Sequence, residues 1–314
     1  MNKNNLREIN PKLITAFKAT ELYQMVMNPD SGLMAFIRNN AIGIYYNSDR
    51  VSMVRFDKRR ELICDVNNYY LDNGRTGDAR VSCDELVSNI DIIKKKSKDR
   101  STPEKKSQHS LVRDNNRFND SEWFCFDIEY RQSTKIQGST GNLFTGRFDI
   151  LAVSKTAPYR LAIIELKYND DAIGGKSGIV KHIKDFVDFK DNQICFENLK
   201  KECVSIIQNY EDLEIPVPKQ LHGLRASGWT NTPEFFVISL YEEISTRGTM
   251  GGYLFQNLRE NWGTKKISSK NAQKILGIDV EAEDSPIKVK FLFKKVDSPQ
   301  SPNINDILNS TEYE

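Results

Sequence analysis

The sequence predicts a mixed α/β protein, with a central mixed sheet flanked by helices and an antiparallel, β-rich region before it. The composition is that of a globular chain with a substantial core, since 39% of the 314 residues are hydrophobic and 28% are charged. Apolar runs separated by polar turns fill the region after about residue 32. The middle of the chain then alternates between helical and strand-like patterns, which favours a mixed sheet with helices around it.

The N-terminal part begins with a short helical start, predicted at about residues 11 to 27. Asn39-Asn40 and Asn47-Ser48-Asp49 then supply turn residues between apolar runs, which predicts an antiparallel meander. Ser82 is placed to cap the next helix, with Glu85 at its third helical position. Thr102 and Pro103 predict the cap and first position of another helix.

The central and C-terminal parts contain five further strand-like runs. The runs lie at 123–131, 146–153, 159–168, 234–241 and 287–296. Helices are expected after Ser177, which can cap the first of them, and at 251–261. The loop at 174–178 has Asp170 where a phosphate-binding loop needs its first glycine, so we exclude an ATPase.

Cysteine usage and hydropathy predict a cytoplasmic protein with no membrane partner. The five cysteines are odd in number and never form a C-x-x-C pair, which argues against a disulfide scaffold or a zinc ribbon. No apolar run reaches the length of a membrane span, and the first residues carry no apolar core of a secretion signal. The formal charge of +2 decides neither for nor against nucleic acid.

The stretch from Lys94 to Arg113 is strongly basic, with eight Lys or Arg against Asp99 and Glu104. Such a run is either a solvated helix face or a surface that contacts phosphates. The candidate nucleic-acid-binding residues are Lys94, Lys95, Lys96, Lys105, Lys106 and Arg113.

Two carboxylates stand in consecutive apolar strands, Asp149 in the first and Glu165 in the second. The short polar connection between the strands predicts a hairpin, which can bring both carboxylates to one edge of the sheet. Neighbouring carboxylates repel each other unless a proton or a divalent cation lies between them, and Mg²⁺ favours such oxygen ligands. Glu165 and Lys167 share a face of their strand, so a simple structural Glu–Lys contact is the alternative.

Asp149, followed on the next strand by Glu165-Leu166-Lys167, resembles the motif of the PD-(D/E)XK nuclease superfamily, which has the restriction-endonuclease-like fold. Phe148 stands where the family name has proline. The surrounding segments look like an uncharacterised bacterial branch of that superfamily, over about residues 30 to 245. The segments that carry this resemblance are 41–54, 103–131, 146–153, 161–170 and 175–186.

The resemblance implies a metal-dependent endonuclease or exonuclease that hydrolyses phosphodiester bonds in nucleic acid, with DNA as the expected substrate. Asp149 and Glu165 would bind Mg²⁺ or Mn²⁺, with the Leu166 carbonyl as a further ligand. Lys167 would position the attacking water and stabilise negative charge.

Supporting residues have one functional and one structural interpretation each. Glu104, with Gln108 one turn later, matches the supporting glutamate of the superfamily, or is a first-turn acid favourable to the helix dipole. Glu129 can reach the metal or bind Arg147 across the sheet. Either Lys181 or His182 can contact phosphate, or both are simply packed or solvated.

We predict three regions: a β-rich region at 1–93 that binds substrate or a partner, a nuclease-like domain at 94–300, and an acidic tail at 301–314. A homodimer or a protein partner is compatible with this organisation. Two alternatives remain for the function. One is a catalytically silent nuclease-fold protein that binds nucleic acid or a protein, and the other is an interaction protein with a structural Glu165–Lys167 pair.

Overall fold

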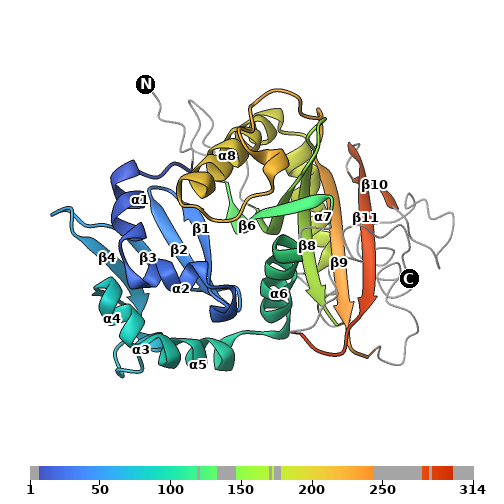
Figure 1. Ribbon diagram of the computed structural model, residues 1–314. Coiled ribbons are helices and arrows are strands. Elements are labelled where there is room, and N and C mark those ends of the chain that lie inside the picture. Colours follow the sequence, from blue (N-terminus) through green and yellow to red (C-terminus); the bar gives the residue numbers. More distant parts are fainter. Residues whose placement is uncertain are drawn as a thin grey trace, which may run out of the picture. The chain divides into compact units, whose positions relative to one another are not determined.

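The computed structural model describes residues 7–118, 121–132, 146–169, 172, 178–243, 278–282 and 285–299 (Figure 1). The chain forms two compact units. The first unit consists of Met1–His109 and Lys201–Arg225, and the second of Ser110–Lys200 and Ala226–Glu314. The predicted helix at 251–261 and the predicted acidic tail at 301–314 lie outside the described residues.

The first unit contains a five-stranded antiparallel sheet in the order β1-β2-β3-β4-β5, which confirms the predicted meander. Its strands are β1 Met34–Arg38, β2 Ala41–Tyr46, β3 Asp49–Phe56, β4 Leu62–Asn67 and β5 Asp78–Val81. The two-residue turn between β2 and β3 has φ angles of 50° at Asn47 and 56° at Ser48. Positive φ at both positions suits the right-handed twist of a tight hairpin, and asparagine tolerates it well.

Short helices accompany the first sheet, and one of them begins at a predicted cap. They are α1 Pro11–Lys18, α2 Glu21–Met27, α3 Asn68–Leu71, α4 Cys83–Ser88 and α5 Ile90–Arg100, with short 3₁₀ turns η1 Pro29–Ser31 and η3 Lys219–Leu221. Ser82 accepts a hydrogen bond from the Glu85 N–H, as predicted for a cap. The predicted helical start at 11–27 is confirmed, and it forms two helices because Thr20 interrupts it and caps α2 through the Tyr23 N–H.

The second unit contains a six-stranded mixed sheet in the order β10-β11-β9-β8-β7-β6. Its strands are β6 Trp123–Arg131, β7 Arg147–Ser154, β8 Leu161–Tyr168, β9 Glu234–Tyr241, β10 Ile278–Ala282 and β11 Ser285–Lys295. Strands β6, β7 and β8 pair antiparallel, whereas β8, β9 and β11 pair parallel. The predicted mixed α/β class is therefore confirmed, and all five predicted strand-like runs form strands.

Three long helices complete the fold: α6 Pro103–Phe118, α7 Ile179–Lys190 and α8 Gln193–Asp212. The Lys105 N–H bonds to Thr102 Oγ1, which confirms the predicted cap of α6. Gly178 rather than Ser177 is the N-cap of α7.

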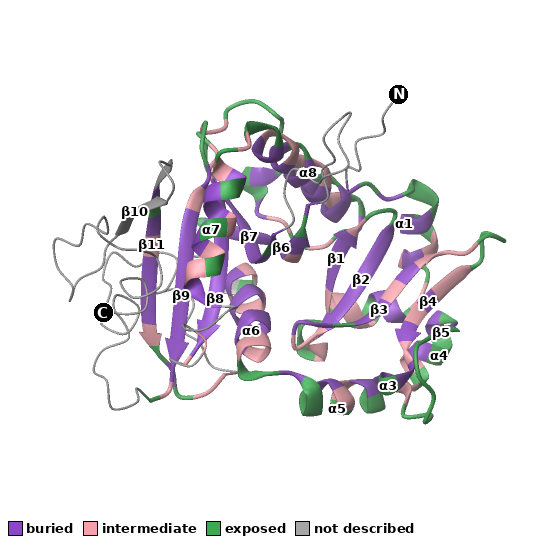
Figure 2. Cartoon of the chain, turned by 180° about the vertical axis from the view of Figure 1, so that it is seen from behind, coloured by how far each residue is buried: buried purple, intermediate pink, exposed green. Residues whose placement is uncertain are grey.

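Helix α7 lies against the second sheet through aromatic contacts. The ring of Phe186 lies 4.8 Å from that of Phe235 on β9, and Phe189 lies 5.3 Å from Phe148 on β7. Every residue of β8 is buried, and Figure 2 shows the central strands in the colour of buried residues. Strand β8 therefore runs through the core of this unit. None of the helices in the described ranges is both long enough and apolar enough to cross a membrane.

Candidate active site

Asp149 and Glu165 lie where the paired strands β7 and β8 separate. The ladder runs from Val153 opposite Leu161 to Ile150 opposite Ile164, so the predicted hairpin is confirmed. Beyond the Ile150–Ile164 pair, the next contact between the two strands is made by the Asp149 side chain instead of by the β7 backbone. Its Oδ2 accepts a hydrogen bond of 2.9 Å from the Leu166 N–H. The two carboxylates thus come from adjacent strands at one position of the sheet.

Glu165 is 1% exposed and its Oε1 accepts two hydrogen bonds. One comes from the Lys167 ammonium at 2.5 Å, and the other from His182 Nε2 on α7 at 2.9 Å. Lys167 is itself 5% exposed, so the pair is almost dry. A buried carboxylate is tolerated only with such partners, because each charge loses its hydration. The predicted shared face of Glu165 and Lys167 is confirmed, and the two side chains are in contact.

The His182 ring, which contacts Oε1 of Glu165, is neutral. Burial and the nearby Lys167 ammonium lower the pKa of His182 to about 4. The imidazole is therefore uncharged near pH 7, and its contact with Glu165 is a hydrogen bond from Nε2–H rather than an ion pair. The sequence predicts that His182 lies on a helix, but its bond to Glu165 depends on how α7 packs.

Asp149 has a strongly perturbed acidity. Burial, with the charge of Glu165 as the next cause, raises the pKa of Asp149 from its ordinary value of 3.8 to about 8. The Lys167 ammonium and the Leu166 N–H act in the opposite direction and do not offset the burial. The charge of Glu165 thus acts on Asp149, and a proton or a divalent cation at the two carboxylates would relieve their repulsion.

The donor set fits a hard divalent cation that keeps most of its water. The available ligands are carboxylate oxygens of Asp149 and Glu165 and a strand carbonyl, which are the ligand types of Mg²⁺ and Mn²⁺. Within the part of the chain that the structure describes, no group of three or more His, Cys, Asp or Glu side chains is arranged as metal ligands. A zinc-type cage is therefore not formed by these residues, whereas a largely hydrated Mg²⁺ fits them.

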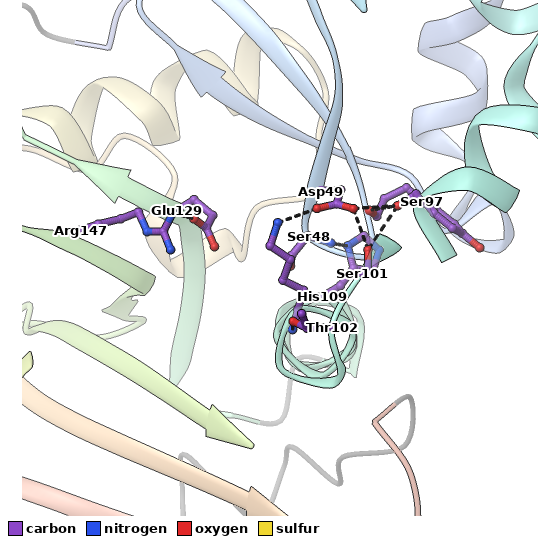
Figure 3. A network of polar contacts seen from close by, with 10 residues as sticks. Ser48, Asp49, Ser97, Ser101, Thr102, His109, Glu129 and Arg147 are labelled. Carbon is purple, nitrogen blue, oxygen red and sulfur yellow. Dashed lines mark hydrogen bonds and ion pairs between the residues drawn. The ribbon is translucent and has the colours of Figure 1, made fainter. Parts of the chain in front are cut away.

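Glu129 binds Arg147, which is one of its two predicted roles. The Oε2 of Glu129 lies 3.0 Å from Nη1 of Arg147, and Figure 3 shows the two side chains facing each other. Glu129 stands between the pairs Ile128–Ile150 and Tyr130–Phe148, at the level of Asp149. Its charge also raises the pKa of Asp149, so it lies close enough to act on the site electrostatically.

Lys181 lies on the solvent side of α7, with 54% of its side chain exposed, and pairs with Asp185 at 2.9 Å. Glu104 and Gln108 belong to the first unit, where Glu104 stands in the first turn of α6. Their supporting roles, and phosphate binding by Lys181 or His182, stay predictions.

Some lysines of the basic stretch 94–113 contact other residues of the first unit. Lys96 pairs with Asp72 at 2.6 Å, and Lys94 lies 5.7 Å from the centre of the Tyr46 ring. Lys95 is exposed. The contacts of Lys94 and Lys96 are thus sufficient to explain these two of the six candidate nucleic-acid-binding residues structurally. The ammonium of Lys95, in contrast, lies in solvent.

Asp49 is the centre of a buried polar network that holds another of these candidates. It accepts hydrogen bonds from Ser101 Oγ at 2.8 Å and from Lys105 Nζ at 2.5 Å, and dashed lines in Figure 3 join Asp49 to Ser97 and Ser101. Since Asp49 is 3% exposed, Lys105 offsets a buried charge. Arg113 likewise pairs with a neighbour, Asp114, at 2.9 Å.

Ser239 on β9 is a site residue that the sequence analysis does not single out. It lies opposite Lys167 in the parallel pair of β8 and β9 and is fully buried. A single polar residue inside the apolar strand 234–241 is the signal that could have identified it.

Comparison of the chain with protein-family models, with curated proteins and with solved structures finds no match. Membership of the PD-(D/E)XK superfamily therefore remains a proposal that rests on the residues themselves.

Proposed function

We propose that the second unit is a metal-dependent nuclease of the PD-(D/E)XK type, with a restriction-endonuclease-like core, that hydrolyses phosphodiester bonds in nucleic acid. DNA is the expected substrate. The observation that carries the proposal is the meeting of Asp149, Glu165 and Lys167 where β7 and β8 separate, with the two carboxylates and the ammonium buried side by side. The mixed sheet and the packing of α7 against it support the same assignment.

Asp149 and Glu165 would hold the Mg²⁺ or Mn²⁺ ion. When bound, the ion supplies Lewis acidity, which lowers the pKa of a coordinated water and polarises the scissile phosphate. The raised pKa of Asp149 supports this role, because two repelling carboxylates gain from a cation that replaces the proton between them.

Lys167 and His182 both contact Oε1 of Glu165 and have different roles in this proposal. The Lys167 ammonium orients the attacking water and offsets the charge that develops on the phosphate, in a site where the low dielectric strengthens its effect. The neutral His182 donates to the same oxygen, Oε1, and so fixes the orientation of the carboxylate. His182 is thus a positioning residue for Glu165 in this proposal.

The deciding experiment is cleavage of a DNA panel with Mg²⁺ and with Mn²⁺, using linear duplex, supercoiled circle, single strand and branched junction. Wild type and Lys167→Ala are compared, and Lys18→Ala serves as the matched control. Lys18 also contacts a glutamate, Glu214, at 2.5 Å, but that pair is exposed in the first unit.

Metal-dependent cutting by wild type and Lys18→Ala, but not by Lys167→Ala, is the expected result. Equal cutting by all three proteins would mean that the site is wrongly assigned. Binding without cutting under every condition would favour the alternative of a silent nuclease-fold protein.

A further inference from the structure

Ser239 breaks the apolar face of β9 at the point where that face meets Lys167. Phe235 and Val237 point to the same side of the strand as Ser239, because they stand four and two residues before it. In the parallel ladder Val237 lies opposite Glu165, and Ser239 lies opposite Lys167. The serine side chain therefore shares a sheet face with both charged residues of the candidate site.

The hydroxyl of Ser239 is buried without a hydrogen-bond partner within the described residues, and the residue is 0% exposed. A buried hydroxyl that bonds to nothing reduces stability, so it calls for an explanation. On the side away from Lys167, Ser239 lies opposite Phe293 of β11, whose side chain has no polar atom. Of the two residues directly opposite Ser239 in the described sheet, Lys167 is thus the polar one.

We propose that Ser239 is a positioning residue for Lys167. Its Oγ accepts a hydrogen bond from one water that the ammonium also contacts, because no direct bond joins the two groups in the described residues. An ammonium has three N–H donors, and Glu165 Oε1 accepts one of them. A second acceptor on the neighbouring strand fixes the direction of the ammonium while Glu165 binds its ligand. The catalytic consequence rests on the proposed function, whereas the contact itself can be tested without cleavage.

The first test is a double-mutant cycle in the metal-free full-length protein, with Tm as the measurement. Ser239→Ala is introduced into wild type and into Lys167→Met. We expect a Tm loss of about 2 to 4 °C in wild type, and no loss in Lys167→Met, where the partner is gone. An equal change of Tm in both backgrounds would overturn the proposal, because the hydroxyl would then act independently of Lys167.

Ser48→Ala is the matched control for this cycle. Its Oγ is also buried without a hydrogen-bond partner, but Ser48 belongs to the turn between β2 and β3 in the first unit. Its Tm change is expected to be the same with and without Lys167→Met. That additivity shows that coupling at Ser239 is specific to its strand position.

The second test measures cleavage. Ser239→Ala is expected to lower kcat by about tenfold with little change in KM, because the ammonium is misdirected while substrate still binds. Ser239→Thr keeps the hydroxyl and suits a strand, so most of the activity should return. A wild-type kcat in Ser239→Ala would overturn the catalytic part of the proposal.

The two tests separate this inference from the nuclease proposal. Coupling between Ser239 and Lys167 in a protein that cuts no nucleic acid would support the positioning contact and count against the nuclease. Metal-dependent cleavage with additive Tm changes would support the nuclease and count against the positioning contact.

Discussion

The backbone N–H of Leu166 donates a 2.9 Å hydrogen bond to Oδ2 of Asp149, and so replaces a rung of the ladder between β7 and β8. Leu166 is covalently joined to both Glu165 and Lys167. The bond therefore fixes the first acid relative to the second acid and the lysine through a single backbone unit. We therefore expect substitution of Asp149 to raise the stability of the metal-free protein and to remove metal binding, and substitution of Lys167 to lower the stability.

Asp149→Asn should stabilise the metal-free protein near pH 8. The pKa of Asp149 is about 8 in the folded protein and near its ordinary 3.8 when unfolded, so between these values only the folded state keeps the proton. Stability therefore falls as the pH rises from about 4 to about 8, and the asparagine, which still accepts from Leu166, removes this fall. Thermal unfolding at pH 5, 7 and 9 measures the effect, expected to be about 2 kcal/mol at pH 8.

Asp57 is a control of opposite sign. It is half-buried, and the backbone N–H of Glu61 is the main cause that lowers its pKa. The stability that its carboxylate contributes is present above the unfolded pKa and is lost as the pH falls. Asp57→Asn should thus slightly lower Tm at pH 7. A rise of Tm in both variants, or in neither, would contradict the account of Asp149.

Mg²⁺ or Mn²⁺ should raise the Tm of wild type but not of Asp149→Ala. A ligand that binds only the folded state adds about 2.7 kcal/mol of stability at one hundred times its Kd. The shift should grow between pH 6 and pH 8.5, since the cation competes with the proton on Asp149. A metal-induced shift of equal size in Asp149→Ala would place the cation elsewhere.

Lys167→Met alone should cost about 3 to 5 kcal/mol of stability, because it leaves the Glu165 carboxylate buried beside an apolar group. Adding Glu165→Gln should recover most of the loss. Lys18→Ala, at the exposed pair with Glu214, should change the free energy of unfolding far less, because solvent screens an exposed ion pair. Denaturant titration gives all three values, and a double variant less stable than Lys167→Met would refute this reading of the pair.

His182→Ala should lower cleavage without removing any step of the pH profile near neutrality. The pKa of His182 is lowered to about 4, so its ring does not change charge between pH 6 and 8. An imidazole NMR signal assigned with His182→Ala should therefore stay constant over that range. A titration of this signal near pH 6.5 would mean that the ring is charged and forms an ion pair with Glu165.

Neutralising the exposed Lys95 together with Lys106 should weaken DNA binding and reduce its dependence on salt, as expected for lost phosphate contacts. Lys105→Ala should instead lower Tm, because it leaves Asp49 buried without its ammonium. Binding by anisotropy at several salt concentrations, beside thermal unfolding, separates the effects. Unchanged affinity and salt slope in the first variant would remove this stretch from the proposed substrate surface.

The sequence by itself determined the elements and the faces of their residues. A short apolar run bounded by polar residues is a local signal, so the strands at 123–131 and 234–241 could be predicted within a residue. The caps at Ser82 and Thr102 are equally local, since each needs a side chain and an N–H three residues away. The two-residue period of a strand placed Glu165 and Lys167 on one face. Thr20 is the exception, because a helical pattern continues across the cap that divides it.

Only the tertiary structure decided which of these groups meet. Glu129 pairs with Arg147 rather than presenting its charge alone, His182 reaches Glu165, and Ser239 lies beside Lys167. Each of these contacts joins residues that are distant in sequence or on different elements, so it depends on strand register and helix packing. Periodicity specifies which side of an element a residue occupies, whereas register and packing select its neighbour there.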